Sequence, residues 1–267
     1  MHGTRGPAGR VGPGVIVVSV SQFRAAILKP SSHRSLRELG AAIIRCRRCP
    51  RLVLHREAAA AEPPRRYRGQ SYWARPLPGF GDPRARLLLI GLAPAAHGGN
   101  RTGRIFTGDQ SGTWLFRALH QAGFANQPSS EHRDDGLTLH DAYVTATIRC
   151  APPANKPAPD EIAACAPYLL RELLLLDRVK VVVGLGRIGW QAYLRARRAL
   201  ALPRPTKTAV FGHGSVTTFP DGTTLLGCYH PSQQNTFTGK LTEPMLRAVF
   251  MTARELISGP AGRLERR

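Results

Sequence analysis

The stretch that most constrains this chain is a glycine-rich loop, residues 91–109, which follows the apolar run Leu87–Ile90. Five glycines lie between Gly98 and Gly112, so the backbone here can adopt positive φ and approach a ligand closely. A strand, a glycine-rich loop and a helix start are the arrangement with which open α/β sheets form a binding crevice. The alternative is an ordinary tight turn. Three side chains in the loop are suited to ligand contact: His97, Phe106 and Asp109.

Apolar runs and amphipathic segments alternate along the rest of the chain. Strands are predicted at Leu87–Ile90, Ala142–Ile148, Val179–Gly184, Val216–Phe219 and Thr224–Tyr229. Helices are predicted at Leu36–Ile44, Gly112–Ala122, Asp160–Leu176, Ile188–Arg198 and Glu243–Ile257. This alternation predicts an α/β fold with a central, mostly parallel sheet covered on both faces. Residues 58–80, which contain four prolines, are predicted to be a basic connection.

The length of 267 residues suits one large domain, which we place at residues 31–258. Residues 1–30 are rich in Gly, Arg and Pro and predict a poorly ordered leader, and residues 259–267 predict a frayed tail. There is no run of 18 apolar residues, so no membrane span is expected. The apolar stretch at 15–20 is too short for the core of a signal peptide. A cytoplasmic monomer is therefore expected.

Charge is strongly unbalanced, with 38 Lys and Arg against 17 Asp and Glu, a net +21. Residues 1–75 alone hold 15 basic and 3 acidic side chains. Such an excess favours a polyanionic partner, with nucleic acid ahead of an acidic membrane, over a merely solvated basic surface.

Four of the five cysteines form two pairs. Cys46 and Cys49 make a CxxC, and Cys150 and Cys165 flank a proline-rich segment. A cytosolic chain does not keep structural disulfides, so a metal site explains the CxxC better. By count, four thiolates suit zinc and an iron–sulfur cluster equally well. Cys228 lies in an apolar strand and is interpreted as a small buried hydrophobe.

The segment Gly184-Leu-Gly-Arg-Ile-Gly189 matches the spacing of a dinucleotide-binding fingerprint. That fingerprint also needs an acidic residue about 20 positions further on for the ribose hydroxyls. No Asp or Glu occurs between Asp177 and Asp221, so close packing of strand and helix is the better interpretation.

A second polar loop follows the last predicted strand. His230 stands at the strand end, Pro231 stiffens the turn, and the polar residues Gln233, Gln234 and Asn235 come next. A lone histidine here is usually structural. Together with the first loop, however, it would set a hydrogen-bond donor opposite the carboxylate of Asp109.

These segments together resemble the uracil-DNA glycosylases, specifically the family 5 (type B) branch. The resemblance covers roughly residues 36–257 and rests on five motifs in the same order: Cys46-Arg-Arg-Cys49-Pro-Arg-Leu52, Gly91-Leu-Ala-Pro-Ala-Ala-His-Gly98, Phe106-Thr-Gly-Asp109, Arg149-Cys-Ala-Pro-Pro-Ala-Asn-Lys-Pro157 and His230-Pro-Ser-Gln-Gln-Asn235. It implies a three-layer α/β/α sandwich and a base-excision repair enzyme that acts near the nucleoid on double-stranded DNA, with single-stranded DNA as a further candidate substrate. It also implies a 4Fe-4S cluster held by Cys46, Cys49, Cys150 and Cys165.

Removal of a base leaves a cationic sugar and an anionic base, which assigns expected roles to the two loops. Asp109 would orient water or counter the sugar's charge, and His230 would stabilise charge on a base carbonyl. Phe106 would stack on the flipped base. The remaining residues expected to contact the substrate are Gly91, Ala93, Ala95, Asn155, Gln233, Gln234 and Asn235.

The chain departs from related families at two places. Ala95 and Ala96 occupy a position where many of these enzymes have a polar or acidic residue, which leaves Asp109 as the nearest carboxylate. Ala146 stands where related families carry a uracil-reading asparagine, and Asn155 is a candidate replacement. Without that amide we expect weaker discrimination, so that hypoxanthine and etheno-cytosine are accepted as well.

The main rival interpretation is a noncatalytic, four-cysteine DNA-binding module that uses the basic N-terminal third. Arg47, Arg48 and Arg51 beside the CxxC favour phosphate contacts in either case.

Overall fold

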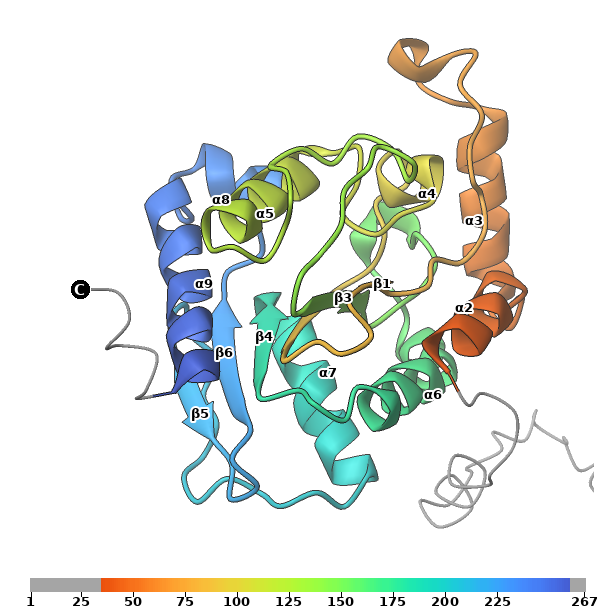
Figure 1. Cartoon of the computed structure of the whole chain (residues 1–267). Helices are drawn as coiled ribbons and strands as arrows, with labels where there is room; N and C mark the ends of the chain where they lie inside the picture. Colours follow the sequence, from red (N-terminus) through yellow and green to blue (C-terminus); the bar gives the residue numbers. More distant parts are fainter. Residues whose placement is uncertain (1–34, 260–267) are drawn as a thin grey trace, which may run out of the picture.

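A six-stranded sheet in the order β1-β3-β2-β4-β6-β5 forms the centre of the molecule, and it is shown in Figure 1. The computed structural model describes residues 35–259; the predicted leader and most of the predicted tail lie outside this range. The four inner strands run parallel: β3 (Ala142–Ala146), β2 (Leu87–Gly91), β4 (Val181–Leu185) and β6 (Thr224–Cys228). The edge strands β1 (Phe80–Gly81) and β5 (Val216–Thr218) are antiparallel to their neighbours.

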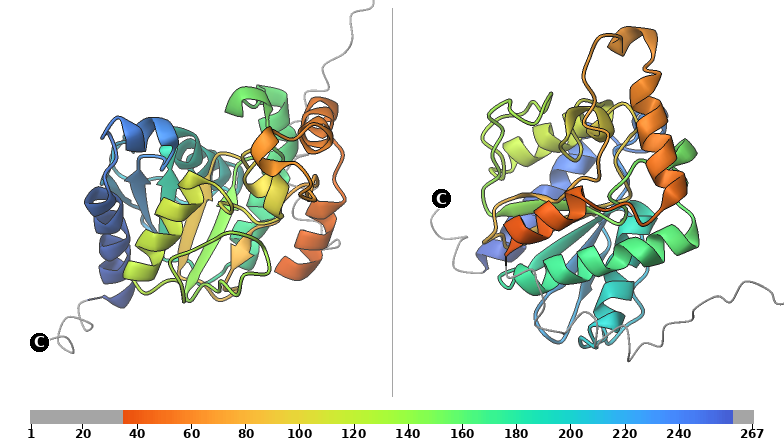
Figure 2. Two further views of the ribbon diagram at one scale, coloured as in Figure 1. Left: turned by 90° about the horizontal axis from the view of Figure 1, so that it is seen from above. Right: turned by 90° about the vertical axis from the view of Figure 1, so that its right-hand side faces the viewer.

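Helices cover both faces of this sheet, as Figure 2 shows. One core combines the odd-numbered side chains of β2 and β4 with α5 (Gln110–Gln121) and α9 (Glu243–Ser258). The even-numbered side chains pack in a second core against α6 (Pro159–Leu175) and α7 (Gly186–Ala199). The four inner strands are buried along their whole length, which explains their continuous apolar runs. The expected three-layer α/β/α fold is confirmed.

A smaller third core joins the cysteine segments to the sheet. It packs α2 (Leu36–Ile44) and the start of α3 (Pro50–Ala61) against Ile148 and α6. Beneath it lies a fully buried ion pair between Arg149 and Glu172, and Thr145 hydrogen bonds to both. Buried charges persist when they are paired in this way. The pair ties the end of β3 to α6 directly beside Cys150.

The predicted elements agree with the structure in type and differ at their ends by two residues at most. Strand β3 ends at Ala146, two residues earlier than expected, although the backbone N–H groups of residues 147 and 148 still hydrogen bond to the carbonyls of Gly91 and Leu92. Five short or polar elements were not predicted: α3, α4 (Gly99–Thr102), α8 (Gln233–Phe237), η1 (Arg65–Tyr67) and β1. A further turn, η2 (Pro153–Asn155), follows Cys150. None of the helices in residues 35–259 is long and apolar enough to cross a membrane.

Candidate active site and cysteine site

The two predicted loops leave the same edge of the sheet, because β2 and β6 are parallel and separated only by β4. Crevices in open α/β sheets form at this carboxyl edge. Strand β2 delivers the glycine-rich loop through Gly91, and β6 delivers His230 two residues beyond its end. The topology therefore places the two predicted functional loops side by side.

Asp109 is the N-cap of α5, and its carboxylate Oδ1 accepts a hydrogen bond from the backbone N–H of Gly112 at 2.9 Å. The other carboxylate oxygen lies against Gly98, where any Cβ atom would overlap it. Burial raises the pKa of Asp109, while the backbone N–H groups of Gly112 and Ser111 act in the opposite direction. The glycines thus let a half-buried carboxylate lie against the loop backbone, held in place by a helix N-terminus.

His230 is held through its backbone, and its ring is left available. Its carbonyl oxygen accepts hydrogen bonds from Asn235 Nδ2 and from the backbone N–H of Ser232, both at 2.8 Å. Among the described residues, no group hydrogen bonds to the imidazole nitrogens. Burial lowers the pKa of His230 to about 4. The imidazole is therefore neutral at pH 7, with one N–H to donate and one nitrogen to accept.

Phe106 connects the two loops. Its ring lies 5.8 Å from the ring of His230, between centroids, and also packs against Gly91, where a Cβ atom would clash with it. The residue is buried and has a φ of 52°, a left-handed conformation that is strained for an aromatic side chain. Such strain is concentrated at functional sites, where the surrounding structure maintains it. Phe106 therefore forms a wall shared by the Asp109 loop and the His230 loop.

The other residues predicted to contact the substrate lie in different parts of the structure. Gly91 pairs with Ala146 across β2 and β3, so both lie at the floor of the carboxyl edge. Ala93 packs against the third core beside the cysteines, and the carbonyl of Ala95 closes the turn that leads into α4. Asn155 is exposed at the end of η2, with a φ of 55°.

The polar tip predicted after His230 is a short helix, α8, capped by the side chain of Ser232. Gln233 and Gln234 are exposed on it. Asn235 is instead partly buried and holds the His230 backbone, so its observed contact is structural support rather than an open face.

Two arginines that brace the glycine-rich loop were not predicted. Arg101 donates to the carbonyls of His97 and Gly108, both at 2.9 Å, and so closes the loop on itself. Arg104 is buried, forms an ion pair with Asp135, and hydrogen bonds to Thr107. Buried arginines do not produce the hydrophobic pattern from which interior residues are predicted. The only sequence feature that could have indicated these two braces was the high density of arginines and glycines in the loop.

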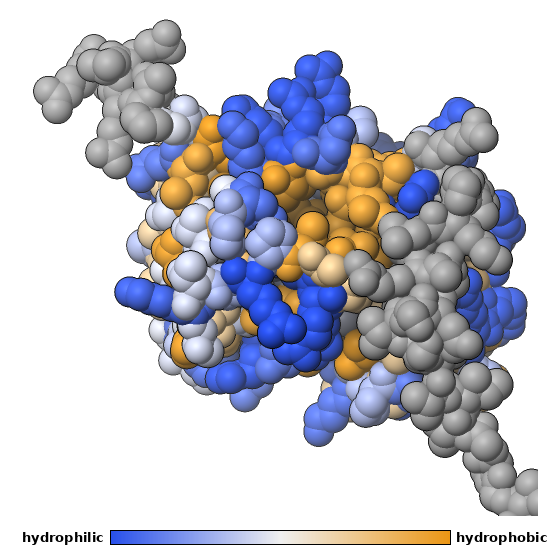
Figure 3. Space-filling model, turned by 90° about the horizontal axis from the view of Figure 1, so that it is seen from below, coloured by the Kyte–Doolittle hydropathy of each residue, from blue (hydrophilic) through white to orange (hydrophobic). Residues whose placement is uncertain are grey.

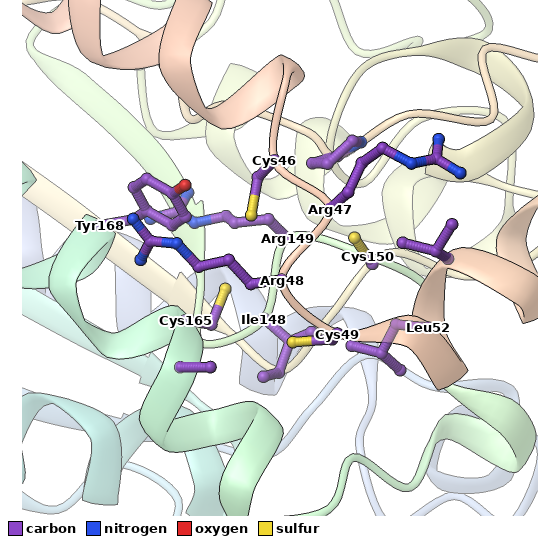
Figure 4. A pocket seen from close by; sticks show the side chains of 13 residues that line it. Cys46, Arg47, Arg48, Cys49, Leu52, Ile148, Arg149, Cys150, Cys165 and Tyr168 are labelled. Atoms are coloured by element: carbon purple, nitrogen blue, oxygen red, sulfur yellow. The ribbon is translucent and has the colours of Figure 1, made fainter.

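The four expected cysteines surround one cavity, and Figure 4 shows their sulfur atoms facing it from three segments of the chain. Within residues 35–259, no three His, Cys, Asp or Glu side chains converge closely enough to hold a single metal ion. A tetrahedral zinc site needs all its sulfurs about 2.3 Å from one point. Four thiols spread around a shared space fit a polynuclear cluster better, because such a cluster offers each cysteine a separate iron.

The surroundings of Arg56 test independently whether the four cysteines fit a negatively charged cluster. Its side chain is 2% exposed, and its Nη1 donates to Cys150 Sγ at 3.0 Å. Its Nε has no hydrogen-bond partner, and the nearest carboxylate, on Glu57, is 3.8 Å away. A buried guanidinium is costly unless an anion faces it. Thiolates bound to a cluster supply that negative charge, whereas burial raises the pKa of the free Cys150 thiol to about 11.

Two further predictions about the sequence agree with the structure. A Cβ at Gly184 would clash with Trp190, and one at Gly189 with the carbonyl of Ile90. These glycines therefore serve strand–helix packing, as inferred. Cys228 is fully buried in β6 and contributes to the apolar core.

Comparisons with known proteins agree with this geometry. Residues 78–254 match the model of the uracil DNA glycosylase superfamily. A Type-5 uracil-DNA glycosylase of Mycobacterium tuberculosis is 51% identical over 223 residues, which cover 83% of this chain and 82% of that protein. A Type-5 uracil-DNA glycosylase of Thermus thermophilus is 51% identical over 211 residues, 79% of this chain and 93% of that protein. The chain belongs to the uracil DNA glycosylase superfamily.

A Type-4 uracil-DNA glycosylase of Saccharolobus solfataricus is also similar, at 32% identity over 112 residues, 42% of this chain and 45% of that protein. This glycosylase is accordingly a hydrolase of the bond between a base and its sugar. The site described above contains a carboxylate held at a helix N-terminus, a neutral imidazole, and an aromatic ring that lies against the imidazole.

Proposed function

We propose that this glycosylase flips uracil out of DNA and hydrolyses its bond to deoxyribose, leaving an abasic site. The observation that supports the proposal most is the contact between Phe106 and His230, which brings the glycine-rich loop against the loop that follows β6. The enzyme would act as a monomer on chromosomal DNA in the cytoplasm, at the start of base excision repair.

In this mechanism the neutral His230 donates its N–H to a carbonyl oxygen of the departing base. Negative charge develops on that oxygen as the bond breaks, so a donor already in position stabilises the transition state more than the ground state. Asp109 orients the attacking water or balances the positive charge of the sugar. Phe106 supports the extruded base from one side, a type of contact worth about 1–3 kcal/mol.

We further propose that the substrate range extends to hypoxanthine and etheno-cytosine. Its basis is Ala146, a buried methyl group at the edge position beside Gly91, which offers no amide to read the polar edge of uracil. A site that lacks such a reading group loses its strongest means of discrimination. Asn155 remains a candidate substitute, from the turn after Cys150.

The direct test is incubation of the purified protein with labelled duplexes that contain one uracil, hypoxanthine, etheno-cytosine, or an unmodified cytosine or thymine. We expect abasic sites in the first three and none in the last two. Release of uracil alone would refute the breadth, and absence of any release would refute the proposed activity.

We also propose that Cys46, Cys49, Cys150 and Cys165 hold a 4Fe-4S cluster. The cavity they share and the buried Arg56 guanidinium beside Cys150 support this assignment. The cluster would brace α2, α3, α6 and the end of β3 around the third core, because hydrolysis of a glycosidic bond moves no electrons.

Metal content tests the cluster directly. We expect a brown protein with about four irons and four sulfides per chain. Cys49→Ser should lower both the iron content and the melting temperature, whereas Cys228→Ala, which removes a thiol from the opposite core, should keep the iron. A colourless protein with one zinc per chain would contradict the assignment.

A further inference from the structure

The helix α3 and the turn η1 form an arm, defined here as residues 50–75, that stands out from the body of the molecule. Figures 1 and 2 show the far end of α3 and the turn η1 rising on the same side as α4 and the glycine-rich loop. The arm therefore projects from the carboxyl edge of the sheet, where the base-binding site lies. Within α3 itself, the buried residues are Leu52, Val53 and Arg56, and the helix buries no residue after Arg56.

The outer part of the arm carries an unbalanced positive charge. Its arginines are exposed, and no Asp or Glu occurs from residue 63 to residue 81. Among the described residues, none of these four side chains forms an ion pair or a hydrogen bond: Arg65, Arg66, Arg68 and Arg75. Guanidinium groups with free N–H donors are well suited to phosphate oxygens.

The arginines beside the cysteines were predicted from the sequence to contact phosphates. Unlike the arm arginines, two of these three side chains form ion pairs. Arg47 pairs with Glu57 at 2.6 Å, and Arg51 pairs with Glu161 at 2.7 Å. Arg48 lies over the ring of Tyr168. Two of the three are thus already neutralised by carboxylates, and the unpaired charge lies further out along the chain.

Aromatic rings hold the arm in place against the active-site loop. The guanidinium of Arg101 lies 4.3 Å from the ring centre of Tyr67, and Arg66 covers the same ring at 4.8 Å. The Tyr72 hydroxyl and His97 Nδ1 are 3.0 Å apart, and Arg101 also donates to Gln70. Because His97 and Arg101 belong to the glycine-rich loop that carries Asp109, the arm is fixed relative to the reaction site.

The face of the molecule opposite the carboxyl edge of the sheet is partly apolar. Seen from below in Figure 3, apolar side chains gather over a broad area between polar ones. An apolar surface does not attract a polyanion. The basic arm lies instead at the carboxyl edge, which is where DNA would reach the base-binding site.

From these contacts we propose that the arm binds the sugar-phosphate backbone of duplex DNA next to the flipped nucleotide, with Arg65, Arg66 and Arg68 on phosphates. The inference rests on the proposed action on DNA and adds a backbone-binding surface outside the base pocket. Phosphate contacts of this kind set register and affinity without reading sequence.

The test measures the affinity for a uracil-free duplex of about 20 base pairs by fluorescence anisotropy, from about 50 to 200 mM salt. The arm variant replaces Arg65, Arg66 and Arg68 by alanine. Its matched control replaces the exposed Arg195, Arg198 and Arg204, which lie on and after the far part of α7, and removes the same charge. A third variant replaces the three arm arginines by lysine.

Each lost phosphate contact lowers the slope of log affinity against log salt by about 0.9, so the arm variant should lose roughly 2 to 3 units of slope. The control should retain its slope, and the lysine variant should recover most of it, since it keeps the charge. Equal slopes for arm variant and wild type, or equal losses in arm and control variants, would overturn the inference.

Thermal melting of all variants excludes unfolding as the cause of a change. The duplex contains no uracil, so the slopes do not depend on base removal. A wild-type protein that binds with the expected slope but releases no uracil would therefore refute the proposed activity and leave the arm unaffected.

Discussion

Asp109→Asn should lose about 10²- to 10⁴-fold in single-turnover uracil release while DNA affinity is retained. The loss follows because an amide cannot balance the sugar's positive charge or accept a proton from water. The fold should be unaffected, because the side chain caps α5 through its bond to Gly112, and asparagine caps helices as well as aspartate does. Release rate, duplex affinity and melting temperature are measured on the same preparation.

The exposed Asp177→Asn serves as the matched control and should change none of these quantities. If Asp109→Asn kept full turnover, the carboxylate would be no more than a helix cap. The rival noncatalytic binding module would be unaffected by this substitution.

His230→Ala should lose about 10²- to 10³-fold in release, the usual cost of removing one donor to a developing anion. The backbone contacts of His230 with Ser232 and Asn235 do not involve its side chain, so α8 should stay in place. His120→Ala, an exposed histidine on α5, is the control. Retention of the rate in His230→Ala would remove the imidazole from the mechanism.

The low pKa of His230 also predicts how the rate of uracil release depends on pH. Burial places the pKa of His230 at about 4, below its usual value of 6.5, so the neutral form is favoured down to that pH. Between about pH 6 and 8 its protonation does not change, and the release rate should show no limb that depends on His230. A rate that fell on acidification through pH 6.5, and lost that dependence in His230→Ala, would contradict the neutral-imidazole role.

The architecture could be predicted from the sequence largely because the inner strands are buried on both faces. β2 and β4 read as unbroken apolar runs, and their flanking helices carry clear apolar stripes. The positions of the two loops followed from the parallel topology. The spacing of the cysteines predicted a four-thiolate site. The resemblance to a known family, rather than periodicity, favoured iron over zinc and guided the roles expected of Asp109 and His230.

The arm and the braces around the site were not predictable by the same reasoning. Helix α3 buries little beyond Leu52, Val53 and Arg56, so it has no apolar stripe from which to predict it. Arg56 and Arg149 are charged residues in the interior, paired with partners more than 20 positions away. A single sequence gives no signal for such pairs, and local propensity cannot show that a strained Phe106 reaches His230.

The central claim is that Asp109 and His230 act on one flipped nucleotide. A crystal structure of the Asp109→Asn variant bound to a duplex with a single uracil tests it most directly. We expect the uracil to lie beside Phe106, an imidazole nitrogen of His230 about 3 Å from a base carbonyl oxygen, and residue 109 beside the sugar. A uracil bound elsewhere, or one that contacts only one of the two loops, would contradict the account.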